Sequence, residues 1–237
     1  MIRQHKKMIL LTSIITLFPI FIGLLLWNQL PDSLATHWGI NNEPNGYASK
    51  TFAVFGLPLI MLLGHAVSVI AMNIDPKVKN ISEKVYFVIL WIIPLLSLFV
   101  CNVLYGYNLG FQLDMGFLCG LMIGVFYLIL GNFIPKVKPN YTIGFRISWA
   151  LCDPENWYRT HRFGGKCMVI GGIIMIVTAP FQNMWILIAL ILVPCILPVI
   201  YSYLYNKEHE VNRLTIAIEC VRYGVQHDEA MRYICNS

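Results

Sequence analysis

Long apolar stretches alternate with shorter polar ones along this chain. Six apolar stretches have no charged residue at their centres, and they cover 8–30, 52–73, 85–106, 115–134, 165–180 and 184–205. A helix that crosses the hydrocarbon core of a bilayer needs about 20 mostly apolar residues. The pattern therefore predicts an all-α, polytopic membrane protein with about six transmembrane helices.

Composition supports this fold class and excludes a soluble domain. Of the 237 residues, 57% are hydrophobic and only 12% are charged, whereas soluble domains carry about 25% charged residues. The stretch 8–30 follows a short basic start, as a signal peptide would, but no small-x-small cleavage site closes it. We therefore expect a retained first helix.

The positions of lysine and arginine predict the orientation. If the N-terminus is inside, Lys50 is the only one of the 17 lysines and arginines that falls in an outside segment. Cytoplasmic segments of membrane proteins are enriched in these residues, so both termini are expected in the cytoplasm. The net charge of +5 then belongs to the face next to anionic lipid, and it does not indicate nucleic-acid binding. The expected location is the bacterial cell membrane, with several passes.

Three parts follow from these spans. We expect an N-terminal membrane domain over 1–106, with an outside loop at 31–51, and a second membrane domain over 107–206, with an inside loop at 135–164. Residues 207–237 are expected to form a cytoplasmic helical tail, predicted helical over roughly 207–233, because their apolar positions follow helical spacing.

The outside loop combines turn chemistry with interfacial aromatic residues. Pro44, Asn45 and Gly46 form a strong turn signal, and tryptophan and tyrosine suit the membrane–water interface. We expect a compact loop that folds back on the bilayer and presents a binding surface. Its candidate binding residues are His37, Trp38, Glu43 and Lys50. The alternative interpretation is an ordinary connector.

The inside loop predicts a short interfacial helix. Asp153 can cap it, Pro154 suits its first position and Glu155 favours its positive end. Trp157 and His161 are four residues apart and share a face of that helix. Arginine donates two parallel hydrogen bonds to carbonyls, carboxylates or phosphates, so Arg146 is expected to form a unit with this face. Asn132 and Asn140 flank a proline-rich helix exit, where amides often satisfy freed backbone groups.

At these residues the chain resembles the SdpI-type immunity proteins of Gram-positive bacteria. Their pattern is, in outline, G-N-x-x-P-K-x-x-P-N-x-x-x-G-I-R-T-P-W-T-L, followed by W-x-x-T-H-x-x-G-G-K. The matching residues are Gly131, Asn132, Pro135, Lys136, Pro139, Asn140, Gly144, Arg146, Trp149, Leu151, Trp157, Thr160, His161, Gly164, Gly165 and Lys166. The outside loop resembles the membrane domain that often precedes this block, through Leu30, Pro31, His37, Trp38, Ser49 and Lys50.

The chain departs from the family pattern at several positions. The departures in the inside loop are Phe145, Ile147, Ser148 and Ala150, and those in the outside loop are Ala35 and Asn45. The resemblance implies membrane immunity against a secreted peptide toxin and, in some operons, signalling through a cytoplasmic repressor held at the membrane. It also implies a functional motif in the inside loop, made of Asn132, Pro135, Asn140, Gly144, Arg146, Trp149, Trp157, Thr160, His161 and Gly165.

Four functions compete: immunity, signalling, transport of a peptide or small solute, and intramembrane catalysis. The sequence has no paired carboxylates in its spans, no Ser/His/Asp set and no His-Glu-x-x-His metal motif. We therefore expect no enzyme, no catalytic or metal-binding residue and no cofactor. The lone span histidine, His65, is expected to bond a neighbouring helix. The expected partners are the lipid bilayer, a secreted peptide toxin and a cytoplasmic repressor, without direct contact to nucleic acid.

Overall fold

The computed structural model describes residues 5–181 and 183–222, with side chains described up to residue 209. Six helices in this part of the chain are long and apolar enough to cross a membrane, which confirms the predicted number of spans. They are α1 (Lys6–Leu25), α2 (Leu57–Ile74), α3 (Glu83–Asn108), α4 (Met115–Phe133), α6 (Pro154–Thr178) and α7 (Met184–Arg222). Shorter elements are the π-helical turn η1 (Phe52–Gly56), the 3-10 turns η2 (Val78–Asn80), η3 (Ile134–Lys136) and η4 (Ala179–Phe181), and helix α5 (Ser148–Cys152).

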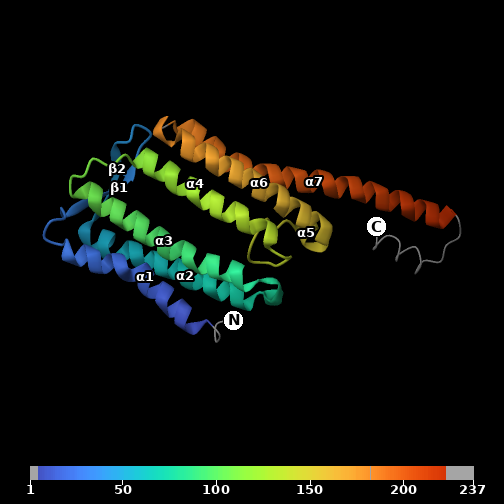
Figure 1. Ribbon diagram of the computed structural model, residues 1–237, viewed down its shortest axis with the longest axis horizontal. Coiled ribbons are helices and arrows are strands. Elements are labelled where there is room, and N and C mark those ends of the chain that lie inside the picture. The colour runs from blue at the N-terminus through green and yellow to red at the C-terminus, as the bar shows by residue number, and fades with distance from the viewer. Residues whose placement is uncertain (1–4, 182, 223–237) are drawn as a thin grey trace.

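The helices form two groups of three. Helices α1, α2 and α3 pack against one another, and both α4 and α7 pack against α6. Figure 1 shows the helices running side by side, with α7 extending well beyond the others. Large apolar side chains such as Leu63 and Ile170 are more than half exposed on the helix surfaces, as expected where lipid replaces water as the solvent.

Polar side chains lie inside the first group instead. Thr12 of α1 and His65 of α2 are buried, and the threonine Oγ1 lies 3.0 Å from the imidazole Nε2. The hydroxyl of Ser97 in α3 donates to the carbonyl of Thr16 at 2.8 Å. The hydrogen bond between helices that was predicted for His65 is therefore confirmed.

Glycine permits close contact inside the second group. A Cβ atom on Gly172 of α6 would lie 2.7 Å from the carbonyl oxygen of Gly124 in α4. On Gly165 it would lie 2.7 Å from the carbonyl oxygen of Gly131 and 2.5 Å from Pro135. The backbones of α4 and α6 thus approach as closely as small-residue surfaces allow.

Three predicted boundaries are corrected. The short helix expected inside the loop 135–164 and the span 165–180 form one continuous helix, α6, because Asp153 caps its start and no proline interrupts it afterwards. The first helix ends at Leu25 rather than at residue 30, since the chain then turns toward the outside loop. The last span continues without a break to Arg222. The predicted tail helix beyond that residue lies outside the described residues.

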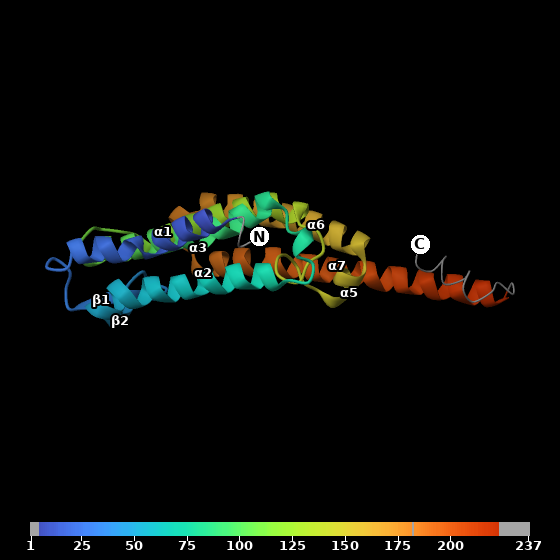
Figure 2. The same ribbon diagram turned by 90° about the horizontal axis from the view of Figure 1, so that it is seen from below.

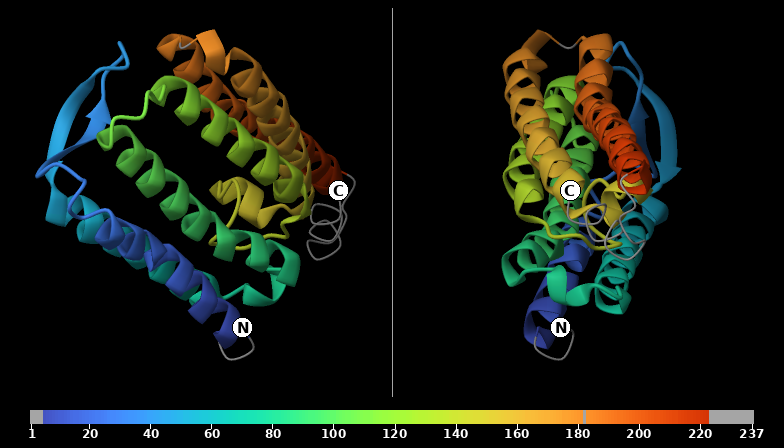
Figure 3. Two further views of the ribbon diagram at one scale, coloured as in Figure 1. Left: turned by 60° about the vertical axis from the view of Figure 1, so that its left-hand side comes forward. Right: turned by 90° about the vertical axis from the view of Figure 1, so that its right-hand side faces the viewer.

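The outside loop is a β-hairpin, which was not predicted. Strand β1 (Ser33–Trp38) pairs antiparallel with β2 (Pro44–Ser49). The turn expected at Pro44-Asn45-Gly46 is wrong, because these residues lie in β2. The chain reverses at 39–43 instead, where Asn42 adopts a left-handed φ of 60° and the Gly39 amide donates to the Glu43 carbonyl at 2.8 Å. The hairpin lies at the end of the molecule opposite to α5, as Figures 2 and 3 show.

Candidate functional site

Two regions hold the predicted site residues. We call residues 31–51 the outer hairpin and residues 135–153 the inner loop. The inner loop runs from η3 to the start of α6 and includes α5. The functional motif that was predicted from the family resemblance begins in this loop and continues into α6. Helix α6 packs directly against the inner loop.

Asn140 organises the inner loop from within. Its side chain is completely buried. Its Oδ1 accepts hydrogen bonds from the backbone amides of Thr142, at 2.9 Å, and Ile143, at 2.6 Å. Its Nδ2 donates to the carbonyls of Lys138, at 2.8 Å, and Ile143, at 3.2 Å. A buried amide with every polar atom paired fixes a loop conformation, which agrees with the structural role expected for this residue.

His161 joins the inner loop to α6. Its Nδ1 lies 2.8 Å from the carbonyl of Trp157, and its Nε2 lies 3.0 Å from the backbone nitrogen of Phe145. A carbonyl only accepts and an amide only donates, so Nδ1 carries the proton and Nε2 accepts. The imidazole also stacks on the Trp157 ring at a centroid distance of 4.0 Å. Gly144 has a φ of +105°, and a Cβ atom there would collide with the imidazole.

Trp157 and Arg146 have different surroundings, although they were predicted to form one unit. Trp157 is 1% exposed and donates from Nε1 to the carbonyl of Val137 at 2.8 Å. Arg146 is exposed, and its Nη1 donates to the carbonyl of Tyr141 at 3.0 Å. The structure thus places Trp157 and His161 in the core and leaves the Arg146 guanidinium at the surface of the inner loop.

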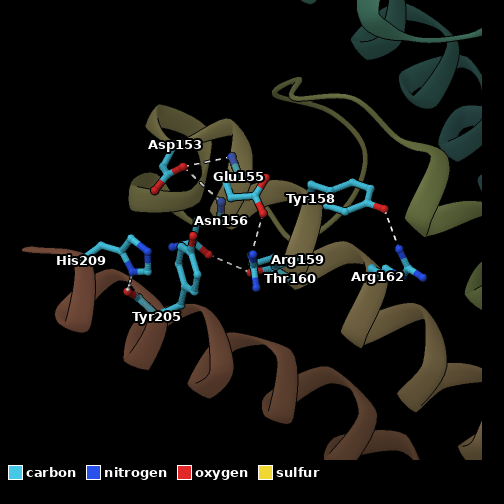
Figure 4. A network of polar contacts seen from close by, with 9 residues as sticks. All are labelled: Asp153, Glu155, Asn156, Tyr158, Arg159, Thr160, Arg162, Tyr205 and His209. Carbon is cyan, nitrogen blue, oxygen red and sulfur yellow. Dashed lines mark hydrogen bonds and ion pairs between the residues drawn. The ribbon is translucent and has the colours of Figure 1, made fainter. Parts of the chain in front are cut away.

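A buried polar network links α6 to α7. The Oδ1 atom of Asn156 accepts from the hydroxyls of Thr160, at 2.9 Å, and Ser202, at 2.8 Å, while its Nδ2 donates to the Ser202 carbonyl at 3.1 Å. Trp149 of α5 donates from Nε1 to the Ser202 hydroxyl at 3.1 Å. Figure 4 shows how Asn156 and Thr160 lie on the first turns of α6, beside α7. Sequence reasoning missed Asn156 and Ser202, since neither forms part of a local motif.

The surface of the same helix carries exposed charged pairs. Arg159 lies 2.6 Å from Glu155, one helical turn away, and its guanidinium also lies over the ring of Tyr205 in α7 at 5.4 Å (Figure 4). Arg162 donates to the hydroxyl of Tyr158 at 2.7 Å. Exposed pairs of this kind contribute little to stability. The buried network of Asn156, Thr160 and Ser202 therefore does more to hold α6 against α7.

The connection between α2 and α3 also holds the inner loop, and sequence reasoning missed it. Asp75 is 5% exposed, and its Oδ2 accepts from the backbone amide of Tyr141 at 2.9 Å and the hydroxyl of Thr142 at 2.7 Å. Asn80 donates to the carbonyl of Pro139 at 2.6 Å. Asp75 could have been predicted from the sequence, because its carboxylate directly follows an apolar stretch. These bonds tie the first helix group to the inner loop.

Two motif residues have local roles. Asn132 is exposed on α4 and donates to the carbonyl of Leu128 in its own helix at 2.8 Å. Pro135 lies against Gly165, where a side chain larger than hydrogen would not fit. Asn132 therefore does not tie down the proline-rich exit, whereas Pro135 sets the contact between η3 and α6.

The outer hairpin is anchored at its base by Lys50. The ammonium lies 3.1 Å from the carboxylate of Asp32, donates to the carbonyl of Trp27 at 3.2 Å, and lies over the Trp27 ring. The hairpin is also fixed to α3, because the side chain of Asn108 bonds both the amide and the carbonyl of Ala35, at 2.8 and 3.1 Å. Lys50 thus holds the hairpin in place next to the end of α1.

The other three predicted binding residues lie nearer the turn. His37 is exposed and pairs with Asn45 across the hairpin. Trp38 is half-buried and packs edge-on against Tyr107 at a centroid distance of 5.0 Å. The side chain of Glu43 is exposed, in the turn. The structure therefore separates Lys50 from this group, so the four residues do not form one cluster. In the described part of the chain, no three His, Cys, Asp or Glu residues are grouped as metal ligands.

The fold and the two regions define a multi-pass cell membrane protein with a structured hairpin at one end and a hydrogen-bonded loop at the other. The SdpI/YfhL protein family model matches residues 136–202, and a domain of unknown function, DUF1648, matches residues 14–62. The chain is 26% identical to Immunity protein SdpI of Bacillus subtilis (strain 168) over 207 residues, which cover 84% of this chain and 96% of that protein. No solved structure matches. The resemblance to the SdpI-type family predicted from the sequence is thereby confirmed.

Proposed function

We propose that this chain is a membrane immunity protein that protects the cell from a secreted, membrane-active peptide. The observation that carries this proposal is the similarity to Immunity protein SdpI, which extends over 84% of the chain and 96% of that relative. Six spans that accommodate a lipid bilayer agree with a role at the membrane.

The outer hairpin is the proposed receptor surface. A membrane-active peptide arrives from outside, and the charge asymmetry of the chain supports an orientation with the hairpin on that side. The hairpin is fixed at its base by Lys50 and along β1 by Asn108, so its exposed turn is presented without much conformational freedom. A preorganised surface loses less entropy when it binds. His37, Trp38 and Glu43 are the contact residues on this account, and Lys50 positions them.

Binding, rather than catalysis, is the proposed basis of protection. In the described residues, the histidine with the most polar contacts, His161, has both ring nitrogens occupied by backbone groups within the protein. It is therefore proposed to hold the inner loop in shape and not to act as an acid or base. Transport of a peptide or small solute is the alternative, and the experiment below distinguishes it from protection by binding.

Signalling is a second proposed function, favoured by one feature of the structure. The hairpin contacts both helix groups, through Asn108 of α3 and through Asn42, whose Oδ1 accepts from the first amides of α4 at 3.0 and 3.2 Å. The inner loop also contacts both groups, through Asp75 and His161. A shift between the groups on peptide binding would alter the exposed surface around Arg146, where a cytoplasmic repressor would be captured.

The experiment uses the peptide fraction of the culture medium that kills cells lacking this chain, which we call the killing fraction. Expression of the chain should restore survival and should increase the amount of peptide bound to cells. Survival without binding, lost when the membrane potential is collapsed, would indicate energised export. If the chain also signals, expression of a reporter gene under the control of the proposed cytoplasmic repressor should rise when peptide binds.

Orientation is tested in the same cells. A cysteine placed at Glu43 should react with a membrane-impermeant maleimide, and one placed at Lys138 should not. Both positions are exposed in the structure, so reaction at Lys138 in intact cells would reverse the orientation and remove the receptor surface from the outside.

A further inference from the structure

A cavity of about 350 Å³ lies beneath the outer hairpin, between the two helix groups. Its walls are the last turns of α3, the first turns of α4, the end of α6 and the start of α7, and residues of the hairpin form its roof. Ligand pockets in proteins typically have volumes of about 300–1,000 Å³. The cavity is therefore large enough for a ligand, and it lies on the side from which the peptide is proposed to arrive.

The lining is mostly apolar, with polar groups from Thr36, His37, Asn42, Thr178 and Asn183. Among the described lining residues none is Asp, Glu, Lys or Arg, and four are methionines: Met115, Met122, Met175 and Met184. An unpaired charge would not enter such a site, because its desolvation is not compensated. Methionine side chains are flexible and polarizable, so they adapt to apolar partners of varied shape. The lining thus favours an uncharged, apolar occupant.

The roof contributes an aromatic ring to the cavity. Trp38 lines the cavity, and its indole Nε1 is buried without a hydrogen-bond partner among the described residues. The accessible lining that Trp38 gives the cavity is therefore the apolar part of its ring. Its edge-on contact with Tyr107 holds that ring in the roof.

We infer that this cavity binds an uncharged, apolar segment of the incoming peptide, which packs against the Trp38 ring in the roof. The inference rests on the proposed immunity function and adds where and how the peptide is held. The hairpin turn makes the first contact, and the apolar segment enters beneath it between α3 and α4. Continuity between the proposed receptor residues and the cavity supports this occupant, since His37 and Trp38 belong to both.

The first test fills the cavity from a wall. Val103 of α3 lines it, whereas Val125 of α4 is exposed on the helix surface and does not. Val103→Phe should lower binding of the killing fraction, and the concentration of that fraction that cells survive, by about tenfold, as the loss of roughly 1.4 kcal/mol of binding implies. Val125→Phe makes the same change in side chain and should leave both unchanged. Both variants are compared at equal amounts in the membrane.

The second test does not depend on how Val103→Phe folds. Cys119 lines the cavity and Cys195 of α7 does not, and both are exposed free thiols. Two chains are made in which one or the other is the sole cysteine, and both are reconstituted in lipid vesicles. The killing fraction should slow the reaction of Cys119 with N-ethylmaleimide by about tenfold, corresponding to about 90% occupancy, and should not affect Cys195.

The outcomes separate the two proposals. If the wild-type chain gives no survival, the immunity function fails. If it protects, but Val103→Phe protects equally and Cys119 keeps its reaction rate, the cavity is not the binding site. If Cys119 reacts in detergent but not in vesicles, with or without the killing fraction, lipid fills the cavity and the inference is overturned.

Discussion

The outer hairpin and the inner loop use polar residues in opposite ways. In the inner loop, Asn140 and His161 are buried, and each of their polar side-chain atoms is paired within the protein. In the outer hairpin, His37 and Glu43 are exposed, and the buried indole nitrogen of Trp38 lacks a partner among the described residues. The inner loop is therefore a folded part of the core, whereas the hairpin carries the polar side chains that we propose for binding.

This difference changes the interpretation of the functional motif that the family resemblance predicted in the inside loop. A functional motif was predicted in the inside loop, but most of its residues fix backbone positions: Gly144 accommodates the imidazole, Pro135 lies against α6, and Trp157 bonds a loop carbonyl. Only Arg146 and Asn132 of the motif are exposed. Any direct role in capturing a partner at the inner end falls to these two residues rather than to the aromatic core.

The largest effect is expected at Gly144. Gly144→Ala places a methyl group against the imidazole of His161 and also strains a φ of +105°, so we expect about 3 kcal/mol of destabilisation or more. Gly110 is the matched control, because its φ is +93° but a Cβ atom there meets nothing within 4 Å. Thermal unfolding of the detergent-solubilised variants measures both. Equal losses would mean that only backbone strain matters and that the contact with His161 is not tight.

A smaller loss is expected at His161. His161→Ala removes the acceptor of the Phe145 amide and leaves that partly buried group unpaired, which costs about 1–3 kcal/mol. His209 gives the comparison: its Nδ1 also bonds the carbonyl four residues back, and its ring also stacks on an aromatic residue, but it is only partly buried on α7. His209→Ala should leave thermal unfolding nearly unchanged. If the two variants unfold alike, the inner loop is less tightly held than described.

The smallest of the stability effects is expected at the base of the hairpin. Lys50→Ala removes one ion pair and one hydrogen bond at a largely buried ammonium, so we expect a loss of about 1 kcal/mol. Lys138→Ala, at an exposed inner-loop position, is the control and should have no effect. Peptide binding by Lys50→Ala should fall by no more than the loss of hairpin stability explains. Complete loss of binding in a stable protein would make Lys50 a contact residue.

The spans could be predicted because hydrophobicity is a local property. An apolar run long enough to cross the bilayer determines a helix whatever its neighbours are, and the asymmetry of lysine and arginine adds an orientation that stays a prediction. Helix ends were predicted less well. The start of α6 was marked by Asp153, but the sequence did not show that the helix continues through the glycine pair at 164–165. In the structure Gly165 lies against Pro135 of η3, and Gly164 lies against Phe145 and Pro198.

The hairpin and the inner-loop contacts could not be predicted because they depend on distant residues. Asn108 satisfies the backbone of Ala35 from 73 positions away, and Asp75 bonds Tyr141 from 66 positions away. No local pattern indicates such pairs. The division into domains at residue 106 likewise stays a prediction, as do the binding roles of the hairpin residues.

The central claim is that the outer hairpin receives the peptide through Trp38, and one paired measurement tests it most directly. Binding of the killing fraction and survival are measured together for Trp38→Ala and for Trp185→Ala, a control at an exposed tryptophan of α7 that does not line the cavity. Loss of a tryptophan that anchors a bound partner typically costs about 2 kcal/mol or more, so binding and survival should both fall more than tenfold for Trp38→Ala and stay normal for Trp185→Ala. Survival that persists in Trp38→Ala without binding, and collapses when the membrane potential is removed, would contradict the claim.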